Sequence, residues 1–468
     1  MESNVATIEV ERCLRLNERV ALPLFGPKRE AHPQQRTPWR IAPEPFPLSE
    51  EEEKFFLRLG DDLLAFYRAS NKLYQESVKN RLPGWIAEYL DFGKPPEVID
   101  YGRMNRFKND LPSVIRPDVL PLGNGFAVSE LDSVPGGIGF TAWLGKQYSR
   151  EGFDVLGGAN GMAENFIAMV SALNPNPGLA IVVSREADDY WDEMVFLGEE
   201  LNSLGFPTRV ARPEQIDFSE KGLSVDGKEI SVLYRFFELF DLKNVPKSEL
   251  FLYSAKKERV RITPPLKAFL EEKMLFALFH HPRLRSFWQS ELGDSYDFLA
   301  KLLPPTWILD DREVPPHAVI PGIELGGRPL HHWLDLLDTK KRERDYVIKA
   351  SGFSDIAWGS RSLAFGKDLS NEDWEESLKK SLASFPKNPF LLQEHRKPKR
   401  TKARYLDFSH LAIEEMEGRT RLCPYYFVQN GKAVLGGILA TICPADKLAI
   451  HGMSDAIMAP CCRGQEDG

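Results

Sequence analysis

The sequence has few cysteines and lacks a long apolar run. Its 5 cysteines are spread over 468 residues, and none form a CxxC pair. This excludes a disulfide framework and makes a structural zinc site unexpected. The N-terminal stretch MESNVATIEVERCLRL has no basic start followed by a continuous apolar segment, and no later run is long enough to span a bilayer. We therefore expect a cytoplasmic protein without a membrane partner.

An excess of positive charge is also missing. Lys and Arg number 60 against 68 Asp and Glu, which gives a formal net charge of -8. General binders of nucleic acid or of anionic membranes are basic, so neither partner is expected. Hydrophobic residues make up 43% and charged residues 27%, which is ordinary for a soluble globular protein. At this length, two or three packed subdomains are expected.

The two ends of the chain are expected to pack less than the middle. Residues 28–48 are rich in proline and charge, which is typical of an extended arm rather than a buried element. Ser49 and Glu52 have the capping-box spacing, and apolar residues then recur at helical intervals, so a long amphipathic helix is predicted to start here. Near the other end, Cys461 and Cys462 are expected in a mobile tail.

The middle of the chain alternates strand-like and helical patterns. LAIVVS is typical of a buried strand, residues 188–205 of a helix that ends at Gly205, and TRVAR of a second strand. This order predicts a β-α-β unit. CPYYFVQNGKAVLGGILATI predicts a hairpin that turns at Asn430-Gly431. The class expected is therefore mixed α/β.

One stretch, IRPDVLPLGNGFAVSELDSVPGGIG, brings an arginine and three carboxylates into a frame of glycines and prolines. RPDVLPL and FAVSELD each alternate polar and apolar positions, and the GNG between them is typical of a tight turn. Two paired strands are predicted.

Residues two apart on a strand share a face, so Arg116 and Asp118 should lie on one side of this hairpin, as should Glu130 and Asp132. Three carboxylates packed together repel, and at least one should then resist ionisation unless a cation is bound. Oxygen-only ligands favour magnesium. An exposed hairpin with a surface ion pair accounts for the spacing equally well.

The segment resembles the glutathionylspermidine synthase type of ATP-grasp ligase, in which an R-x-D pair is followed by E-x-N. Arg116, Asp118 and Glu130 fit this pattern, while Asp132 stands where the family often has Asn. Further similar segments follow in the family's order: LYRFFELFD, EEKMLFALFHHP, PPTWIL, YVIKASGFSDIAWGS and LLQEH. The resemblance implies a circularly permuted ATP-grasp fold with a β-α-β subdomain, and ATP and Mg²⁺ as cofactors.

The patterns and the resemblance together predict four regions. They are an N-terminal arm (1–48), a helical region with the metal-binding strands (49–178), the β-α-β subdomain (179–265) and the ATP-binding part of the core (266–468).

The resemblance makes Lys273 and Lys349 the nucleotide-binding lysines. A small-residue loop that includes Ser351 and Gly352 follows Lys349, and its amides would approach phosphates closely. The loop departs from the family's usual glycine- and arginine-rich form. A solvated surface lysine is the alternative for Lys273.

Four further residues have competing interpretations. Gln393 and Glu394 fall where the family's adenine-side linker lies, where backbone groups would bind the base, but a plain edge strand is an equal alternative. Arg235 would hold an acidic substrate or would only cap a sheet edge. Arg421 would face phosphate or have a structural role.

The resemblance implies an ATP- and magnesium-dependent carboxylate–amine ligase that works through an acylphosphate. Asp118, Glu130 and Asp132 would hold magnesium, and Arg116 would assist phosphoryl transfer. Two alternatives are a nucleotide-sensing protein without turnover, favoured by Asp132 and the altered loop, and an ATP-dependent phosphotransferase. The expected partners are a small carboxylic acid and an amine. The sequence determines neither their identity nor the oligomeric state.

Overall fold

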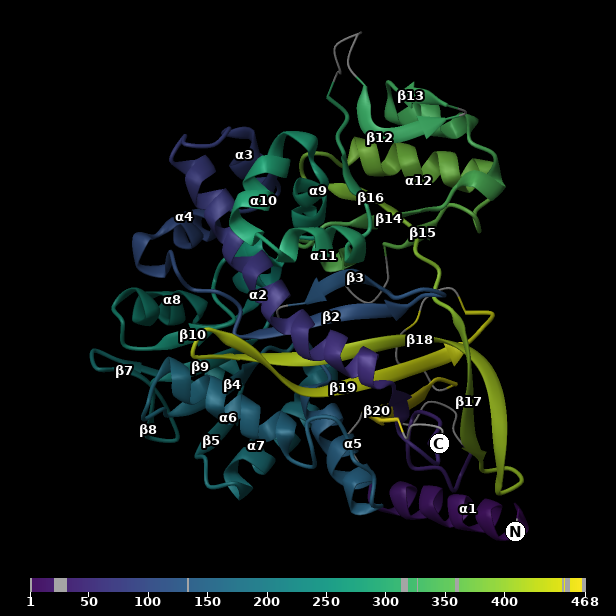
Figure 1. The fold of residues 1–468 in the computed structure, drawn as a ribbon. Helices are drawn as coiled ribbons and strands as arrows, with labels where there is room; N and C mark the ends of the chain where they lie inside the picture. Colours follow the sequence, from purple (N-terminus) through teal and green to yellow (C-terminus); the bar gives the residue numbers. More distant parts are fainter. Residues whose placement is uncertain are drawn as a thin grey trace.

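A computed structural model describes residues 2–20, 32–132, 134–312, 319–325, 327–357, 362–447, 450 and 455–464. These residues form a mixed α/β fold, which confirms the predicted class (Figure 1). The α-helices are α1 (Glu2–Glu18), α2 (Glu50–Val78), α3 (Trp85–Asp91), α4 (Pro96–Arg103), α5 (Ile138–Arg150), α6 (Gly161–Leu173), α7 (Trp191–Ser203), α8 (Ser248–Lys256), α9 (Met274–His280), α10 (Arg285–Leu292), α11 (Ser295–Leu302) and α12 (Asn371–Ala383).

The strands of the described ranges form one large sheet and several smaller ones. The seven-stranded sheet contains, in spatial order, β1 (Phe46–Leu48), β20 (Ile457–Arg463), β19 (Lys432–Pro444), β18 (Ala412–Gln429), β2 (Val114–Pro121) and β3 (Phe126–Asp132), with β17 (Arg400–Asp407) paired to β18. A four-stranded parallel sheet has the order β10 (Arg261–Thr263), β9 (Val232–Phe236), β4 (Leu179–Val183) and β5 (Thr208–Ala211).

A second four-stranded sheet is antiparallel, in the order β11 (Thr306–Leu309), β16 (Phe390–Glu394), β14 (Tyr346–Ala350) and β15 (Ala364–Phe365). The smaller sheets are β12 (Ile320–Leu325) with β13 (Arg328–Leu330), and β6 (Asp217–Ser219) with β7 (Gly222–Val225) and β8 (Lys228–Ile230).

Helices cover both faces of the seven-stranded sheet. Neighbouring residues of a strand point to opposite faces, so Tyr426 packs in the core that contains α2, while Phe427 packs with α5 and α6. Helix α2 crosses the sheet in Figure 1. It begins as predicted, because Ser49 and Glu52 form the capping box. The sheet is therefore the centre of two hydrophobic cores.

The parallel sheet contains the predicted β-α-β unit, β4–α7–β5. The helix is shorter than the predicted 188–205, because a 3-10 turn at Asp188–Tyr190 precedes it. Gly205 follows the helix with φ of +80°, a conformation that suits glycine, and this confirms the predicted end.

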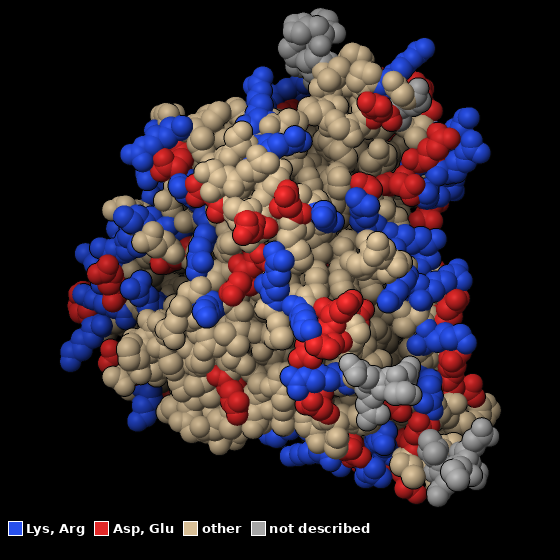
Figure 2. All heavy atoms as spheres, viewed as in Figure 1, with Lys and Arg blue, Asp and Glu red and all other residues tan. Residues whose placement is uncertain are grey.

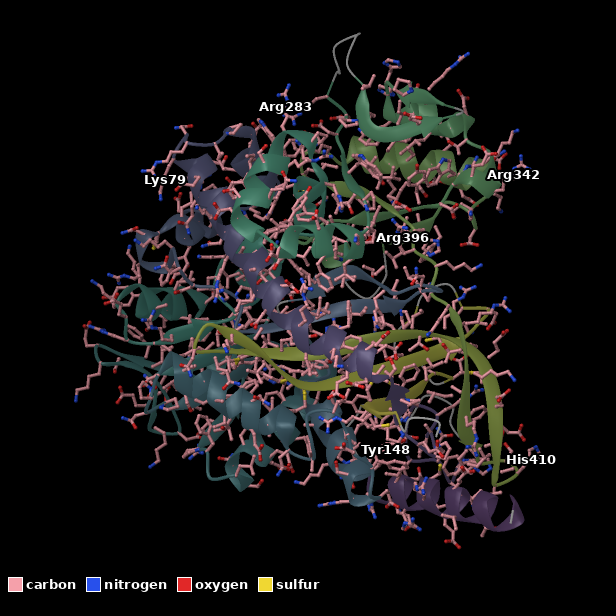
Figure 3. All side chains as sticks on the ribbon, in the orientation of Figure 1. Lys79, Tyr148, Arg283, Arg342, Arg396 and His410 are labelled. Carbon is pink, nitrogen blue, oxygen red and sulfur yellow. The ribbon has the colours of Figure 1, made fainter. Side chains whose placement is uncertain are left out.

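The antiparallel four-stranded sheet forms a separate lobe with α12, at the upper right of Figure 1. It has its own core, which includes Ile348, Trp374 and Leu392. The chain leaves this sheet through a segment with Arg396, labelled in Figure 3, and enters the β17–β18 hairpin, whose tip carries His410 near α1.

Both chain ends pack more than expected. Residues 2–18 form helix α1, which was not predicted, and the described part of the arm buries Ile41 and Leu48. Strand β1 pairs with β20 at the edge of the sheet, where Pro47 is tolerated because one side of the strand needs no ladder hydrogen bonds. The predicted tail is also wrong as far as residue 464, because Cys461 is buried in β20.

The surface carries both signs of charge, which alternate over the face shown in Figure 2. Within the described ranges, no helix combines the length and the apolar composition needed to cross a membrane.

Candidate functional site

The predicted hairpin forms from β2 and β3, and its register brings the predicted charges together. Arg116 lies opposite Asp132, and Asp118 lies opposite Glu130. The register then shifts, so that Val119 pairs with Val128 and Ser129 has no partner in the ladder. This bulge leaves the Ser129 carbonyl available to another part of the chain.

Two arginines bind the carboxylates of the hairpin. The Arg116 guanidinium lies 2.8 Å from Asp118 Oδ1 and 2.7 Å from Asp132 Oδ2. Arg421, on the neighbouring β18, lies 2.9 Å from Asp118 Oδ2. The other Asp132 oxygen accepts a hydrogen bond of 3.0 Å from the Val134 amide. Because Asp118 is buried, the interpretation as a solvated surface ion pair is wrong.

The expected repulsion among the carboxylates does not hold for Asp118, which is surrounded by two arginines. Burial alone would raise the pKa of Asp118, but the charges of Arg421 and Arg116 outweigh burial and hold the pKa below its ordinary value. The carboxylate is therefore stabilised in its ionised form by side chains of the protein itself.

Two lysines that are distant in the sequence meet at β3. Lys273, which precedes α9, lies 3.0 Å from Glu130 Oε1 and donates a hydrogen bond of 2.9 Å to the Ala357 carbonyl. Lys349, on β14, donates to the Ser129 carbonyl at 2.8 Å and to Gln393 Oε1 at 2.9 Å. Lys273 is therefore not a free surface lysine. Both predicted nucleotide-binding lysines face the predicted metal-binding hairpin.

Lys349 differs from the other cations of this cluster. Its described hydrogen bonds go to neutral oxygens, and no carboxylate of the described residues lies within ion-pair distance of it. Burial lowers the pKa of Lys349 to about 8, against the opposing effect of Glu130. A buried ammonium without an acidic partner is a favourable place for an anionic ligand.

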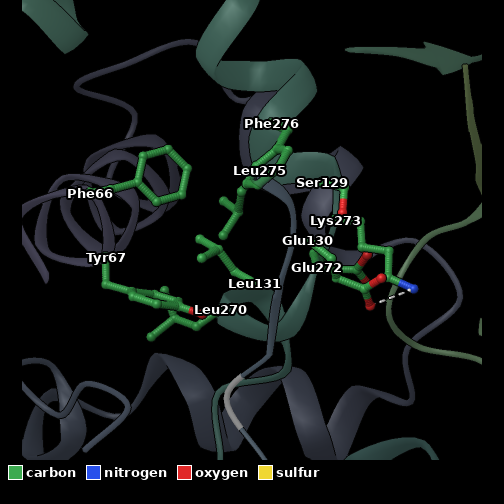
Figure 4. A pocket seen from close by; sticks show the side chains of 10 residues that line it. All are labelled: Phe66, Tyr67, Ser129, Glu130, Leu131, Leu270, Glu272, Lys273, Leu275 and Phe276. Carbon is green, nitrogen blue, oxygen red and sulfur yellow. Dashed lines mark ion pairs between the residues drawn. The ribbon is translucent and has the colours of Figure 1, made fainter. Parts of the chain in front are cut away.

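A small pocket lies between this charged cluster and α2 (Figure 4). Phe66, Tyr67 and Leu270 line its apolar side, and Glu130 and Lys273, joined by an ion pair, line the other. The free volume is about 10 Å³, which is close to the space that one water needs. The pocket itself therefore does not accommodate a nucleotide.

The small residues of the turn after β14 are explained by close contacts within the protein. The Gly352 amide donates a hydrogen bond of 2.9 Å to Glu272 Oε2, and the Ser351 hydroxyl bonds the same oxygen. A Cβ on Gly352 would lie 2.2 Å from the Glu271 carbonyl oxygen, so glycine is needed for this close approach of two backbones. Residues 358–361 of the predicted phosphate loop lie outside the described residues.

Gln393 and Glu394 lie on β16, between β11 and β14, so the interpretation as an edge strand is wrong. The Glu394 amide donates to the Pro305 carbonyl, and the next amide, of His395, donates to the Asp345 carbonyl, both at 2.8 Å. These amides are already paired in this structure. Gln393 instead contributes its side chain, which accepts a hydrogen bond from Lys349.

Arg235 is fully buried in β9, an interior strand. Its guanidinium forms an ion pair with Glu271 and hydrogen-bonds the Phe237 carbonyl. It is therefore neither a cap at a sheet edge nor accessible to a substrate. Burial and the neighbouring Glu271 raise the pKa of Glu238, which follows this strand.

The charged hairpin differs from a magnesium site in the partners of its carboxylates. The hairpin supplies the carboxylate oxygens that magnesium prefers, but Asp118, Asp132 and Glu130 are each bound to a basic side chain. Among the described residues, no group of three or more His, Cys, Asp or Glu side chains is placed to hold a metal ion. The observed arrangement does not fit a metal site.

Three buried or half-buried charges beside the cluster were not predicted: Glu271, which pairs with Arg235, and Glu272, which pairs with Lys94. Glu271 and Glu272 belong to the charged run EEK, a pattern more typical of a solvated helix end than of a buried cluster. Lys94 belongs to no motif. The burial of these residues depends on segments that meet only in the folded chain.

Comparisons with known proteins show the fold. No protein-family model matches the chain, and no curated protein sequence does. A glutathione synthetase-like effector from Globodera pallida, solved in its apo form, is similar, with a TM-score of 0.57, 13% sequence identity and coverage of 98% of each chain. A putative gamma-glutamylcysteine synthetase from Methylobacillus flagellatus gives a TM-score of 0.39 and 11% identity over 83% of this chain and 84% of that one. The chain therefore shares the fold of the synthetase-like effector.

Proposed function

We propose that this protein is an ATP-dependent carboxylate–amine ligase with a circularly permuted ATP-grasp fold of the glutathionylspermidine synthase type. The observation that carries the proposal is the meeting of Lys273 and Lys349 at the Ser129–Glu130 segment of β3. The fold shared with a glutathione synthetase-like protein supports it. The expected substrates are a small carboxylic acid and an amine.

The roles of the residues follow from their charges. Lys349 would bind phosphate oxygens, since it is buried without an acidic partner among the described residues. Lys273 would exchange Glu130 for a phosphate, and Arg116, oriented by Asp118 and Asp132, would stabilise charge on the transferring phosphoryl group. Magnesium would enter with ATP.

The test is ADP release in mixtures of carboxylic acids and amines, followed by the masses of the products. We expect ADP formation to need an acid and to leave an amide when an amine is present. Lys349→Met should weaken nucleotide binding by roughly 1.5–3 kcal/mol, the range for a hydrogen bond to a charged group. Lys397→Met, at an exposed position of the chain, is the matched control. Failure of the parent to bind ATP with magnesium at millimolar concentration would refute the proposal.

A second candidate function is nucleotide sensing without turnover. The observation that favours it is the ion-paired state of Asp118, Glu130 and Asp132. Sensing predicts nucleotide binding with no ADP release in any substrate mixture, so the same assay separates the two functions.

A further inference from the structure

A buried ion pair involves the residue directly before Lys273. Lys94, in the loop after α3, forms an ion pair with Glu272, and each side chain is only 2% exposed. The Glu272 carboxylate also accepts hydrogen bonds from the Ser351 hydroxyl and the Gly352 amide. One carboxylate therefore joins three separate segments of the chain.

The turn after β14 makes further contacts with other segments of the chain. The Ser351 amide donates to the Pro389 carbonyl at 2.9 Å, and the Ser351 hydroxyl accepts from the Met274 amide at 3.3 Å. The Lys94 ammonium lies 5.4 Å from the centroid of the Phe353 ring, within the range of a cation–π contact. The backbone of this turn has little freedom to move independently of residues 271–274.

These contacts lie next to both lysines in the sequence. Lys273 directly follows Glu272, and Lys349 stands two residues before Ser351. The two lysines bind neighbouring residues of β3, Lys273 the Glu130 carboxylate and Lys349 the Ser129 carbonyl. The distance between the two ammonium groups therefore depends on how firmly the 271–274 segment is fixed to the turn at 351–353.

We propose that Glu272, charge-balanced by Lys94, is a positioning residue that holds Lys273, Lys349 and the Ser351–Gly352 turn in one preformed phosphate-binding arrangement. The inference rests on the proposed function for its ligand, ATP. Glu272 does not touch the ligand. It acts by fixing the groups that do, and prior positioning of binding groups lowers the entropic cost of binding.

The test compares three variants. Glu272→Ala removes the acceptor, Glu272→Gln keeps an acceptor oxygen, and Lys94→Met removes the balancing charge. The control, Glu9→Ala, removes a carboxylate that is 6% exposed and paired with Arg404, far from the site. Each is measured for its melting temperature, for the Kd of the ATP analogue AMPPNP with magnesium chloride, and for hydrogen–deuterium exchange of peptides that cover residues 351–357 without nucleotide.

We expect Glu272→Ala to weaken AMPPNP binding at least 10-fold and to speed exchange at Gly352. Glu272→Gln keeps a neutral acceptor for the Gly352 amide but leaves the buried Lys94 ammonium unpaired, so its affinity should lie between those of the parent and Glu272→Ala. Glu9→Ala should lower the melting temperature with Kd unchanged, which separates positioning from general stability. If Glu272→Ala does not fold, Lys94→Met must show the same loss of affinity and the faster exchange.

The inference is overturned if folded Glu272→Ala binds AMPPNP within 2-fold of the parent. If Glu272→Ala does not fold, the same result in Lys94→Met overturns it. If the parent itself binds no AMPPNP, the proposed function fails separately, and the exchange data then decide. Unchanged exchange at Gly352 would show that Glu272 does not hold the turn.

Discussion

The β18–β19 and β2–β3 hairpins of the seven-stranded sheet are held in different ways. The β18–β19 hairpin packs apolar side chains on both faces, against α2 on one and α5 and α6 on the other. The β2–β3 hairpin ends in ion pairs, with Arg116 between Asp118 and Asp132. Apolar packing fixes a strand without specific partners, whereas each charge needs a particular counter-charge. The second hairpin also buries Ile115, Val119 and Val128, but its charged end needs particular partners from elsewhere in the fold.

The largest effect is expected in the apolar hairpin. Phe427 is fully buried, with its ring 6.0 Å from that of Phe166, so Phe427→Ala should lower the free energy of unfolding by about 3–5 kcal/mol. Urea denaturation measures it. Val434→Ala, at a position that is 36% exposed on β19, is the control and should cost less than about 1 kcal/mol. Equal costs for the two would mean that packing does not fix this hairpin.

The next effect concerns the helix that follows the charged hairpin. Glu193, on α7, is buried against the N-terminus of α5, where its carboxylate accepts a hydrogen bond of 3.0 Å from the Gly139 amide, and burial raises its pKa to about 7. Because the pKa is higher folded than unfolded, the stabilising contribution is complete below the unfolded pKa of 4.5 and is lost as the pH rises through 7.

The free energy of unfolding of the parent should fall between pH 5 and pH 8. In Glu193→Gln this fall should be smaller, by at most roughly 3 kcal/mol. Melting curves across this pH range measure the effect. Parallel pH profiles for the parent and Glu193→Gln would show that Glu193 does not titrate in this range.

The smallest effect is expected within the charged hairpin. Asp132→Asn removes a charged partner of Arg116, so without magnesium the variant should be less stable by about 1–2 kcal/mol. A repulsive cluster of carboxylates would give the opposite sign, with the Asn variant as stable as the parent or more so. Asp217→Asn, at an exposed position on β6, is the control. Magnesium alone should change the melting temperature of the parent little, and a large increase would favour a metal site.

Many elements were predictable because their signals are local. The capping box at Ser49 and the turn at Asn430-Gly431, with φ values of 52° and 80°, depend on residues that are close in the sequence. The packed arm and the strand at Cys461 were not predicted, because their stability comes from pairing between the two ends of the chain. The fold's permutation and the four regional boundaries stay predictions.

The sequence by itself determined the β2–β3 hairpin and the face that its charges share, because alternation along a strand is a local property. Only the tertiary structure decided the partners of those charges. Arg421 arrives on β18, Lys273 from the segment before α9 and Lys349 on β14. Since an ion pair depends on distance and burial, and neither is encoded in residue spacing across such separations, the cluster could not be derived from the sequence alone.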